Sequence, residues 1–75
     1  MNEIKLGKYQ HYKGNMYEVI GLARHSETLE ELVVYKALYT SPEFGDGALW
    51  VRPRAMFFEN VIVNGLEVPR FKLVE

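Results

Sequence analysis

Short runs of β-branched and aromatic residues, separated by turn residues, recur along the whole chain. Residues 8–13 are K-Y-Q-H-Y-K, and after Gly14-Asn15 a second β-rich run begins at Met16. Because glycine and asparagine tolerate positive φ, this segment predicts a β-hairpin. Gly21 lies in the middle of the second run, where a glycine is typical of a β-bulge or a sharp bend.

The segment from Thr28 to Thr40 carries two conflicting patterns. Residues 28–31, T-L-E-E, match a helix capping box, and the apolar residues that follow have helical spacing. In contrast, the β-branched and aromatic residues Val33-Val34-Tyr35 and Tyr39-Thr40 favour a strand. We expect a strand. Since both of its alternating rows are apolar, it should lie centrally with cover on both sides, or in an oligomer interface.

After this segment the pattern predicts a loop, a strand and a helical turn. Residues 41–47, S-P-E-F-G-D-G, indicate one long surface loop. Residues 48–52, A-L-W-V-R, form the next expected strand. Pro53 ends that strand because it has no N–H for a ladder, and it can open one helical or 3₁₀ turn over residues 54–57.

The C-terminal third contains the strongest turn signal of the chain. Asn64-Gly65 is a preferred pair for a two-residue type I′ turn, so residues 61–63 should pair with residues 66–68. Pro69 then interrupts the returning strand, and residues 70–74 complete the fold.

These elements predict one β domain covering residues 1–75. The expected fold is mainly β, a small SH3-like, partly open antiparallel barrel of five to six strands with one short helical turn. A length of 75 residues excludes a second core. Cysteine is absent, so no disulfide supports the fold, and the 13% of aromatic residues must supply most of the core.

Charge and hydropathy narrow the classes of partner. The formal net charge is −1, which argues against a general polyanion binder, although a local basic patch leaves nucleic acid possible. No apolar run approaches the ~20 residues that span a bilayer, and the first residues lack the basic and apolar pattern of a secretory signal. We therefore expect a cytoplasmic protein without a membrane partner.

Several motifs occur together in a fixed order along the chain. They are GKYQHYKG, Tyr17-Glu18-Val19, residues 23–28 (ARHSET), residues 32–35 (LVVY), residues 49–53 (LWVRP), Met56-Phe57 and residues 68–71 (VPRF). From Gly7 to Val74 the chain thereby resembles the bacterial domain-of-unknown-function family 1653. The resemblance implies a small, uncharacterised bacterial protein and no particular activity. The family pattern often carries glycine after His-Ser-Glu-Thr, where this chain has Leu29.

The residue types of common active sites are present, but their spacing is wrong for catalysis. His25-Ser26-Glu27 contains the residue types of a hydrolase triad, yet neighbours on a strand point to opposite faces, so a polar turn is the better interpretation. Gly45-Asp46-Gly47 precedes a strand and not the helix that a phosphate loop requires. His11 and His25 are the only histidines and lack a metal-ligand spacing. We expect no catalytic residues, no metal and no cofactor.

One group of residues does suggest binding, namely cations that lie beside rings in or near the predicted strands. Guanidinium groups next to aromatic surfaces suit a carboxylate, a phosphate or an unstacked base. The acidic residues Glu27, Glu30, Glu31, Glu43 and Asp46 are expected in two loops instead. Each ring also suits the core, and each arginine can cover an aromatic face or pair with an acid such as Glu59. The candidate ligand-binding residues are Arg24, His25, Tyr35, Lys36, Trp50, Arg52 and Arg54.

Two functions follow from these observations. The first is a non-enzymatic binding module that uses a basic, aromatic-lined face for an anionic small ligand, nucleic acid or an acidic peptide. The alternative is a structural or assembly protein that forms a homo-oligomer, or docks on a protein partner, through an exposed strand.

Overall fold

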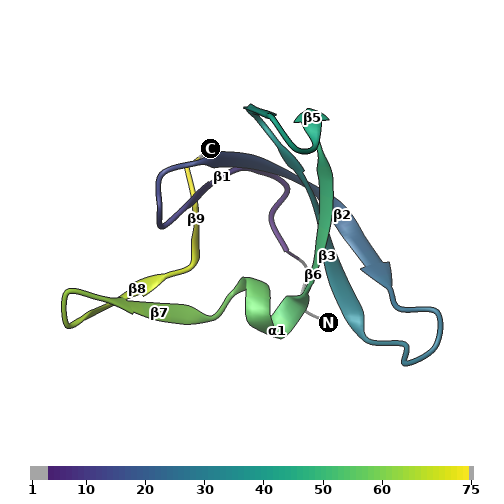
Figure 1. Ribbon diagram of the computed structural model, residues 1–75. Helices are drawn as coiled ribbons and strands as arrows, with labels where there is room; N and C mark the ends of the chain where they lie inside the picture. Colours follow the sequence, from purple (N-terminus) through teal and green to yellow (C-terminus); the bar gives the residue numbers. More distant parts are fainter. Residues whose placement is uncertain (1–3, 75) are drawn as a thin grey trace.

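The computed structural model describes residues 4–74, which fold around one curled antiparallel sheet (Figure 1). The strand order in this sheet is β6-β3-β2-β1-β9. Its members are β1 (Gly7–His11), β2 (Met16–Arg24), β3 (Glu31–Ala37), β6 (Leu49–Pro53) and β9 (Phe71–Leu73). The sheet does not close, so β6 and β9 are its two edges.

The remaining elements extend this sheet or cross its open side. A small hairpin of β4 (Thr40–Ser41) and β5 (Gly45–Asp46) lies between β3 and β6 in the chain. The short helix α1 (Arg54–Phe57) follows β6 and leads into a second hairpin, formed by β7 (Asn60–Val63) and β8 (Leu66–Pro69). We call this second hairpin the arm. In Figure 1, α1 and β7 cross the open side of the arch between β6 and β9.

The strong turn signals of the sequence are confirmed. β1 pairs with β2 across a turn in which Gly14 has a φ of 109°. The register of β2 against β3 shifts between Val19 and Gly21, which makes a bulge where the glycine predicted one. Asn64 and Gly65 have φ values of 53° and 80°, as a type I′ turn requires, and they join the two strands of the arm.

The segment from Thr28 to Thr40 is confirmed as a strand only over Glu31–Ala37. The helical alternative is wrong, because residues 26–28 form a turn that leads into β3. In this turn the Leu29 N–H donates to the His25 carbonyl at 2.9 Å, and Leu29 has a left-handed φ of 64°. The expected cover on both sides of β3 is also wrong: Val33 and Tyr35 are buried on the concave face, whereas Lys36 is exposed on the other.

The prediction of one long loop over residues 41–47 is also wrong. Thr40 pairs with Asp46 and Ser41 with Gly45, so most of the segment is a tight hairpin. The Thr40 hydroxyl donates to Oδ1 of Asp46 at 3.1 Å and supports this short ladder. In outline, however, the mainly β, open antiparallel fold with one short helical turn is confirmed.

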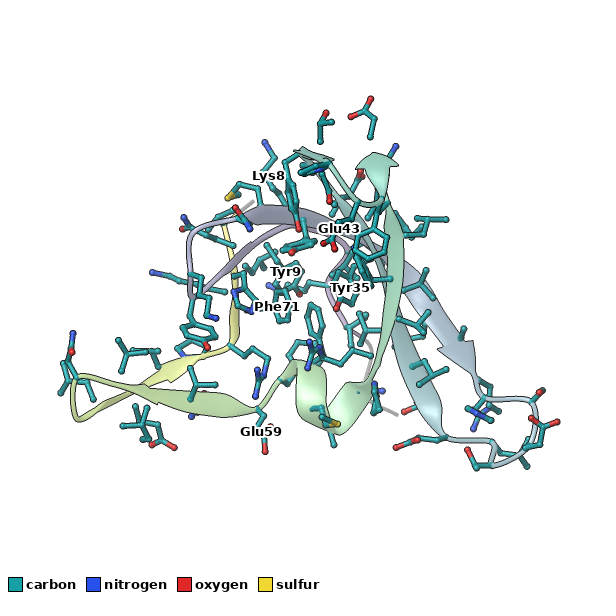
Figure 2. The ribbon with its side chains drawn as sticks, in the orientation of Figure 1. Lys8, Tyr9, Tyr35, Glu43, Glu59 and Phe71 are labelled. Atoms are coloured by element: carbon teal, nitrogen blue, oxygen red, sulfur yellow. The ribbon has the colours of Figure 1, made fainter. Side chains whose placement is uncertain are left out.

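Aromatic rings fill the core on the concave face of the sheet. Phe57 of α1 is 0% exposed and stacks on Phe71 with ring centroids 4.1 Å apart. Tyr9 and Tyr35 contact Phe57 at ring distances of 5.6 and 5.3 Å. Figure 2 shows Tyr9, Tyr35 and Phe71 gathered in this space. The helical turn opened by Pro53 therefore delivers the ring that closes the core from the open side.

Candidate functional site

Two arginines and a histidine gather at the edge of the ring cluster on the concave face. They are Arg52, Arg70 and His11, and together with Tyr17 and Tyr35 we call them the concave site. Arg52 lies directly opposite the buried Val33 and therefore faces the concave side. Its Nε donates to the hydroxyl of Tyr35 at 3.5 Å, so the buried ring positions the guanidinium.

Tyr17 supplies a second phenol to the site. Its ring packs edge-on against Tyr35 at 5.3 Å and Phe71 at 5.6 Å, and its hydroxyl lies 2.6 Å from that of Tyr39. Burial and the hydrogen bond with Tyr39 raise the pKa of Tyr17, although Arg52 acts in the opposite direction. The phenol is therefore neutral at physiological pH and retains both donor and acceptor capacity.

The protonation of His11 reflects the charges around it in the concave site. Its ring contacts Phe71 at 4.9 Å, and its Nδ1 accepts the Lys13 N–H at 3.2 Å, which places the proton of the neutral ring on Nε2. Burial lowers the pKa of His11, and the positive charges of Arg52, Arg70 and Lys13 lower it further. A neutral, donating imidazole thus lies in a positive potential.

The two arginines differ in their partners. Arg70 forms an ion pair with Glu59 at 3.3 Å, as expected for an arginine beside a loop acid, yet its buried Nε has no hydrogen-bond partner within residues 4–74. Arg52 forms no ion pair anywhere in that range. A half-buried cation without a carboxylate can offer its remaining donors to an anion.

A cavity opens beside His11, between the β1–β2 hairpin and the arm. Its volume is about 370 Å³, within the range of small-ligand sites. The hairpin contributes Gln10, His11 and Tyr12, the arm contributes Val63 and Val68, and Lys72 of β9 adds another cation to the lining. The cavity is thus apolar on the side of the arm and polar on the side of the sheet.

Three of the residues predicted from the sequence share the concave face. Tyr35 and Arg52 belong to the concave site itself. Trp50 lies opposite Tyr35 on the neighbouring strand, packs against the core and meets the Phe44 ring edge-on at 5.0 Å. The packing of Trp50 is that of a core residue at the margin of the site.

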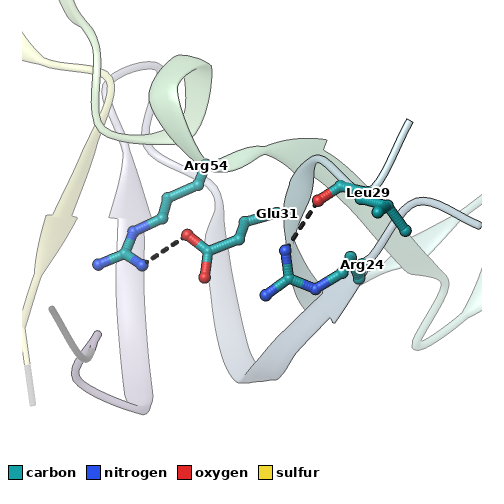
Figure 3. A network of polar contacts seen from close by, with 4 residues as sticks. All are labelled: Arg24, Leu29, Glu31 and Arg54. Atoms are coloured by element: carbon teal, nitrogen blue, oxygen red, sulfur yellow. Dashed lines mark hydrogen bonds and ion pairs between the residues drawn. The ribbon is translucent and has the colours of Figure 1, made fainter. Parts of the chain in front are cut away.

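The other predicted residues lie elsewhere. Arg54 forms an ion pair with Glu31 at 2.9 Å, and Arg24 donates to the Leu29 carbonyl at 2.8 Å (Figure 3). The expected separation of acids from cations is therefore wrong for Glu31, which begins β3. A cavity of about 440 Å³ adjoins Arg54, but Glu30 and Glu31 also line it, so its charge is mixed.

His25 and Lys36 do not lie on the same surface as Arg52. Nδ1 of His25 accepts the N–H groups of Glu27 and Thr28 at 3.1 and 3.3 Å, which confirms the polar turn expected there. Lys36 is exposed on the convex face. Because side chains alternate along a strand, Lys36 and its neighbour Tyr35 point to opposite faces of the sheet.

His11, Tyr17 and Arg70 are not among the candidate ligand-binding residues chosen from the sequence. The signal for the first two was present, because Tyr9 and His11 alternate on β1 and Tyr17 is the partner of Tyr9 on β2. Arg70 joins them only because β9 pairs with β1, with Phe71 opposite His11. That pairing brings together segments near the two ends of the chain, and no local sequence pattern predicts it.

Residues 4–74 contain no group of three or more histidine, aspartate or glutamate residues that could hold a metal ion. No helix over the same residues is both long and apolar enough to cross a membrane.

Comparison with known proteins gives a family but no activity. A family model described as "Protein of unknown function (DUF1653)" matches residues 7–73. A crystal structure of a protein belonging to DUF1653 from Bordetella bronchiseptica superposes with a TM-score of 0.85 at 36% sequence identity, covering 96% of this chain and 88% of the other. No curated protein matches the chain.

Proposed function

This chain belongs to the family of unknown function DUF1653, and we propose that it is a non-enzymatic binding module whose concave site holds a small anionic ligand. Arg52 carries this proposal. It is half-buried, is held by the Tyr35 hydroxyl, lacks an ion pair within residues 4–74, and contributes to the lowered pKa of His11. A charge that its own fold leaves uncompensated favours an anion from outside.

The size and charge of the site favour a small anion over nucleic acid or an acidic peptide. The cavity of about 370 Å³, which has His11 in common with the concave site, suits one compact ligand. An extended polyanion requires many phosphate contacts, whereas the chain has a net charge of −1 and its predicted cations are divided between two faces. A carboxylate or phosphate group would receive donors from Arg52, Arg70 and the Nε2 of His11. An SH3-like relationship of the fold, a bacterial source and a cytoplasmic location remain parts of this proposal.

Isothermal titration with three defined anions, pyrophosphate, citrate and adenosine monophosphate, tests the proposal. At least one should bind the native chain, and Arg52→Ala should weaken its binding about tenfold to a hundredfold, the effect of one charged hydrogen bond. Lys36→Ala is the matched control, because it removes a cation from the convex face. Circular dichroism checks that both variants fold. The proposal is wrong if none of the anions binds, or if a folded Arg52→Ala variant binds as tightly as Lys36→Ala.

A second candidate function is assembly through β6. This strand is an edge of the five-stranded sheet, and the convex side next to it exposes Leu49 and Val51. An apolar edge strand favours pairing with another chain. Such a contact would join the backbone edge of β6 and the apolar residues on its convex side.

A further inference from the structure

The free edge of β6 has a defined hydrogen-bonding phase. β6 pairs with β3 in the register Leu49 to Lys36, Val51 to Val34 and Pro53 to Leu32. The Ala37 N–H donates to the Ala48 carbonyl at 2.8 Å, which makes this the hydrogen-bonded type of pair. Because the two types alternate, Trp50 and Arg52 direct their backbone groups towards β3. Leu49, Val51 and Pro53 direct theirs to the free edge.

The proline on this strand fits that phase. Pro53 occupies an outward-facing position, so its missing N–H removes nothing from the ladder with β3. Leu49 and Val51 each present an N–H and a carbonyl to the outside, and within residues 4–74 no strand pairs with this edge.

The convex side of the same strand is apolar. Leu49 is 64% exposed and Val51 57% exposed, and Val34 lies beside Val51 on β3. Ile20, the extra residue of the bulge on β2, is 45% exposed. A free backbone edge with an apolar row beside it has the features of a strand-pairing surface.

We propose that β6 pairs antiparallel with β6 of a second copy of this chain, about a two-fold axis through Val51. Val51 then lies opposite Val51 of the second copy, Leu49 opposite Pro53, and Trp50 opposite Arg52. This inference deepens the second candidate function and does not depend on the anion site.

The pairing satisfies the outward backbone groups that β6 presents. The two Val51 residues exchange both hydrogen bonds of a hydrogen-bonded pair. Each Leu49 N–H meets a Pro53 carbonyl, the one group that proline still offers. The Leu49 carbonyl, which faces the missing N–H of Pro53, lies at the end of the ladder, where water can reach it.

The side chains are complementary on both faces of the joined sheet. On the convex face, Leu49, Val51 and Pro53 of the two copies form one apolar row. On the concave face, Trp50 lies opposite Arg52 in the closer, non-hydrogen-bonded type of pair, which brings the guanidinium to the indole ring for a cation–π contact. Arg52 has no ion pair within residues 4–74 that this contact would break. One strand thus supplies both halves of an isologous interface, which is why a second copy is the partner.

Disulfide trapping tests the register, because the chain has no cysteine of its own. Val51→Cys places the two sulfurs at the two-fold axis, where the Cα atoms are about 5.5 Å apart, close enough for a disulfide. Leu49→Cys is the matched control on the same face of the same strand. Its two copies are offset along the ladder by about 13 Å, from the rise per residue, and cannot be bridged. Rapid oxidation of Val51→Cys alone to a dimer supports the register. Equal or faster trapping of Leu49→Cys contradicts it.

Sedimentation of the native chain from about 1 µM to about 1 mM tests the dimer itself. Val51→Lys should raise the dimer dissociation constant about tenfold or more, because it sets like charges opposite each other and removes an apolar contact. Ile62→Lys on the arm is the control, since Ile62 is 69% exposed and belongs to β7, which is not part of the sheet that contains β6. A native chain that stays monomeric, or a dimer equally tight in Val51→Lys, overturns the inference. Anion titrations of Val51→Lys keep the two proposals separate, because this variant leaves the concave site intact.

Discussion

The sheet and the arm are both antiparallel, yet different forces hold them. On β3, the alternate residues Val33, Tyr35 and Ala37 are all buried, so the sheet is stabilised by rings and aliphatic groups packed in the core. Neither strand of the arm has a fully buried residue, and among residues 4–74 the two strands pair only with each other. An isolated two-stranded hairpin is marginally stable in water, so the arm depends on its turn and on its base.

The base of the arm is a small network of backbone and charged groups. The Arg70 N–H donates to the Glu59 carbonyl at 3.0 Å, and the Tyr12 N–H donates to the Arg70 carbonyl at 2.9 Å. The side chains of Arg70 and Glu59 form the ion pair described above. Because the cavity beside His11 lies between the arm and the sheet, its shape depends on the less stable of the two regions.

The largest effect should come from removing a ring of the core. Phe57→Ala is expected to lower the free energy of unfolding by about 3–5 kcal/mol, which leaves so small a domain largely unfolded. Ile62→Ala in the arm should change it by no more than about 0.5 kcal/mol, the usual range for exposed positions. Urea denaturation followed by circular dichroism measures both. Similar losses for the two variants would show that the arm contributes to the core.

A substitution in the arm turn should have a smaller and more local effect. Gly65→Ala forces alanine to a φ of 80°, at a cost of about 1–2 kcal/mol, although no atom lies within 4 Å of the added methyl group. Hydrogen exchange should become faster in β7 and β8 while the amides of β2 and β3 keep their protection. Uniformly faster exchange would mean that arm and sheet unfold as one unit.

In contrast to the substitutions above, a substitution in the turn before β3 should not lower the stability of the domain. Leu29 has a left-handed φ of 64°, and its side chain is largely exposed, so Leu29→Gly removes backbone strain without removing a core contact. We expect stability to stay the same or to rise by up to about 1 kcal/mol, since the greater freedom of glycine in the unfolded chain offsets part of the gain. Leu66→Gly, in a strand of the arm, should lower stability by a few tenths to about 1 kcal/mol. Thermal denaturation compares the two, and a clear loss for Leu29→Gly would contradict the assigned turn.

The smallest effect should be the pH dependence of stability that His11 causes, at the cavity between the sheet and the arm. The folded state lowers the pKa of His11, chiefly by burial, so the neutral ring is favoured. The corresponding stability is fully present above the unfolded pKa of about 6.5 and is lost as pH falls below that value, because the unfolded chain then binds more protons. The loss should be smaller in His11→Gln. Melting temperatures between about pH 8 and pH 5 measure this difference, and an equal or steeper loss in the variant would contradict the role of His11.

Much of the local structure followed from the sequence because it depends on neighbouring residues. Gly14-Asn15 and Asn64-Gly65 determine two hairpins through their tolerance of positive φ, and Pro53 separates β6 from the helical turn that carries Phe57. The turn at Leu29 was not predicted as left-handed from the residue itself, since leucine rarely adopts that conformation.

The candidate site was only partly predictable. Tyr35, Trp50 and Arg52 do lie on one face, but the same reasoning grouped them with Lys36 and His25, which lie elsewhere. A strand has two faces, and a single sequence with apolar residues in both rows does not reveal which of them is covered. Tertiary packing determines which face is covered, because the rings of Phe57 and Phe71 pack on the face that carries Tyr35.

By itself, the sequence determined a small β domain, the positions of its tight turns and its dependence on aromatic rings for a core. Only the tertiary structure decided which residues meet in the concave site, where His11 from β1 and Arg70 before β9 join Arg52 from β6. It also decided that β6 is an edge and which of its backbone groups face outward. The physical reason is range: turns depend on the φ preferences of adjacent residues, whereas faces and edges depend on pairings between segments far apart in the chain.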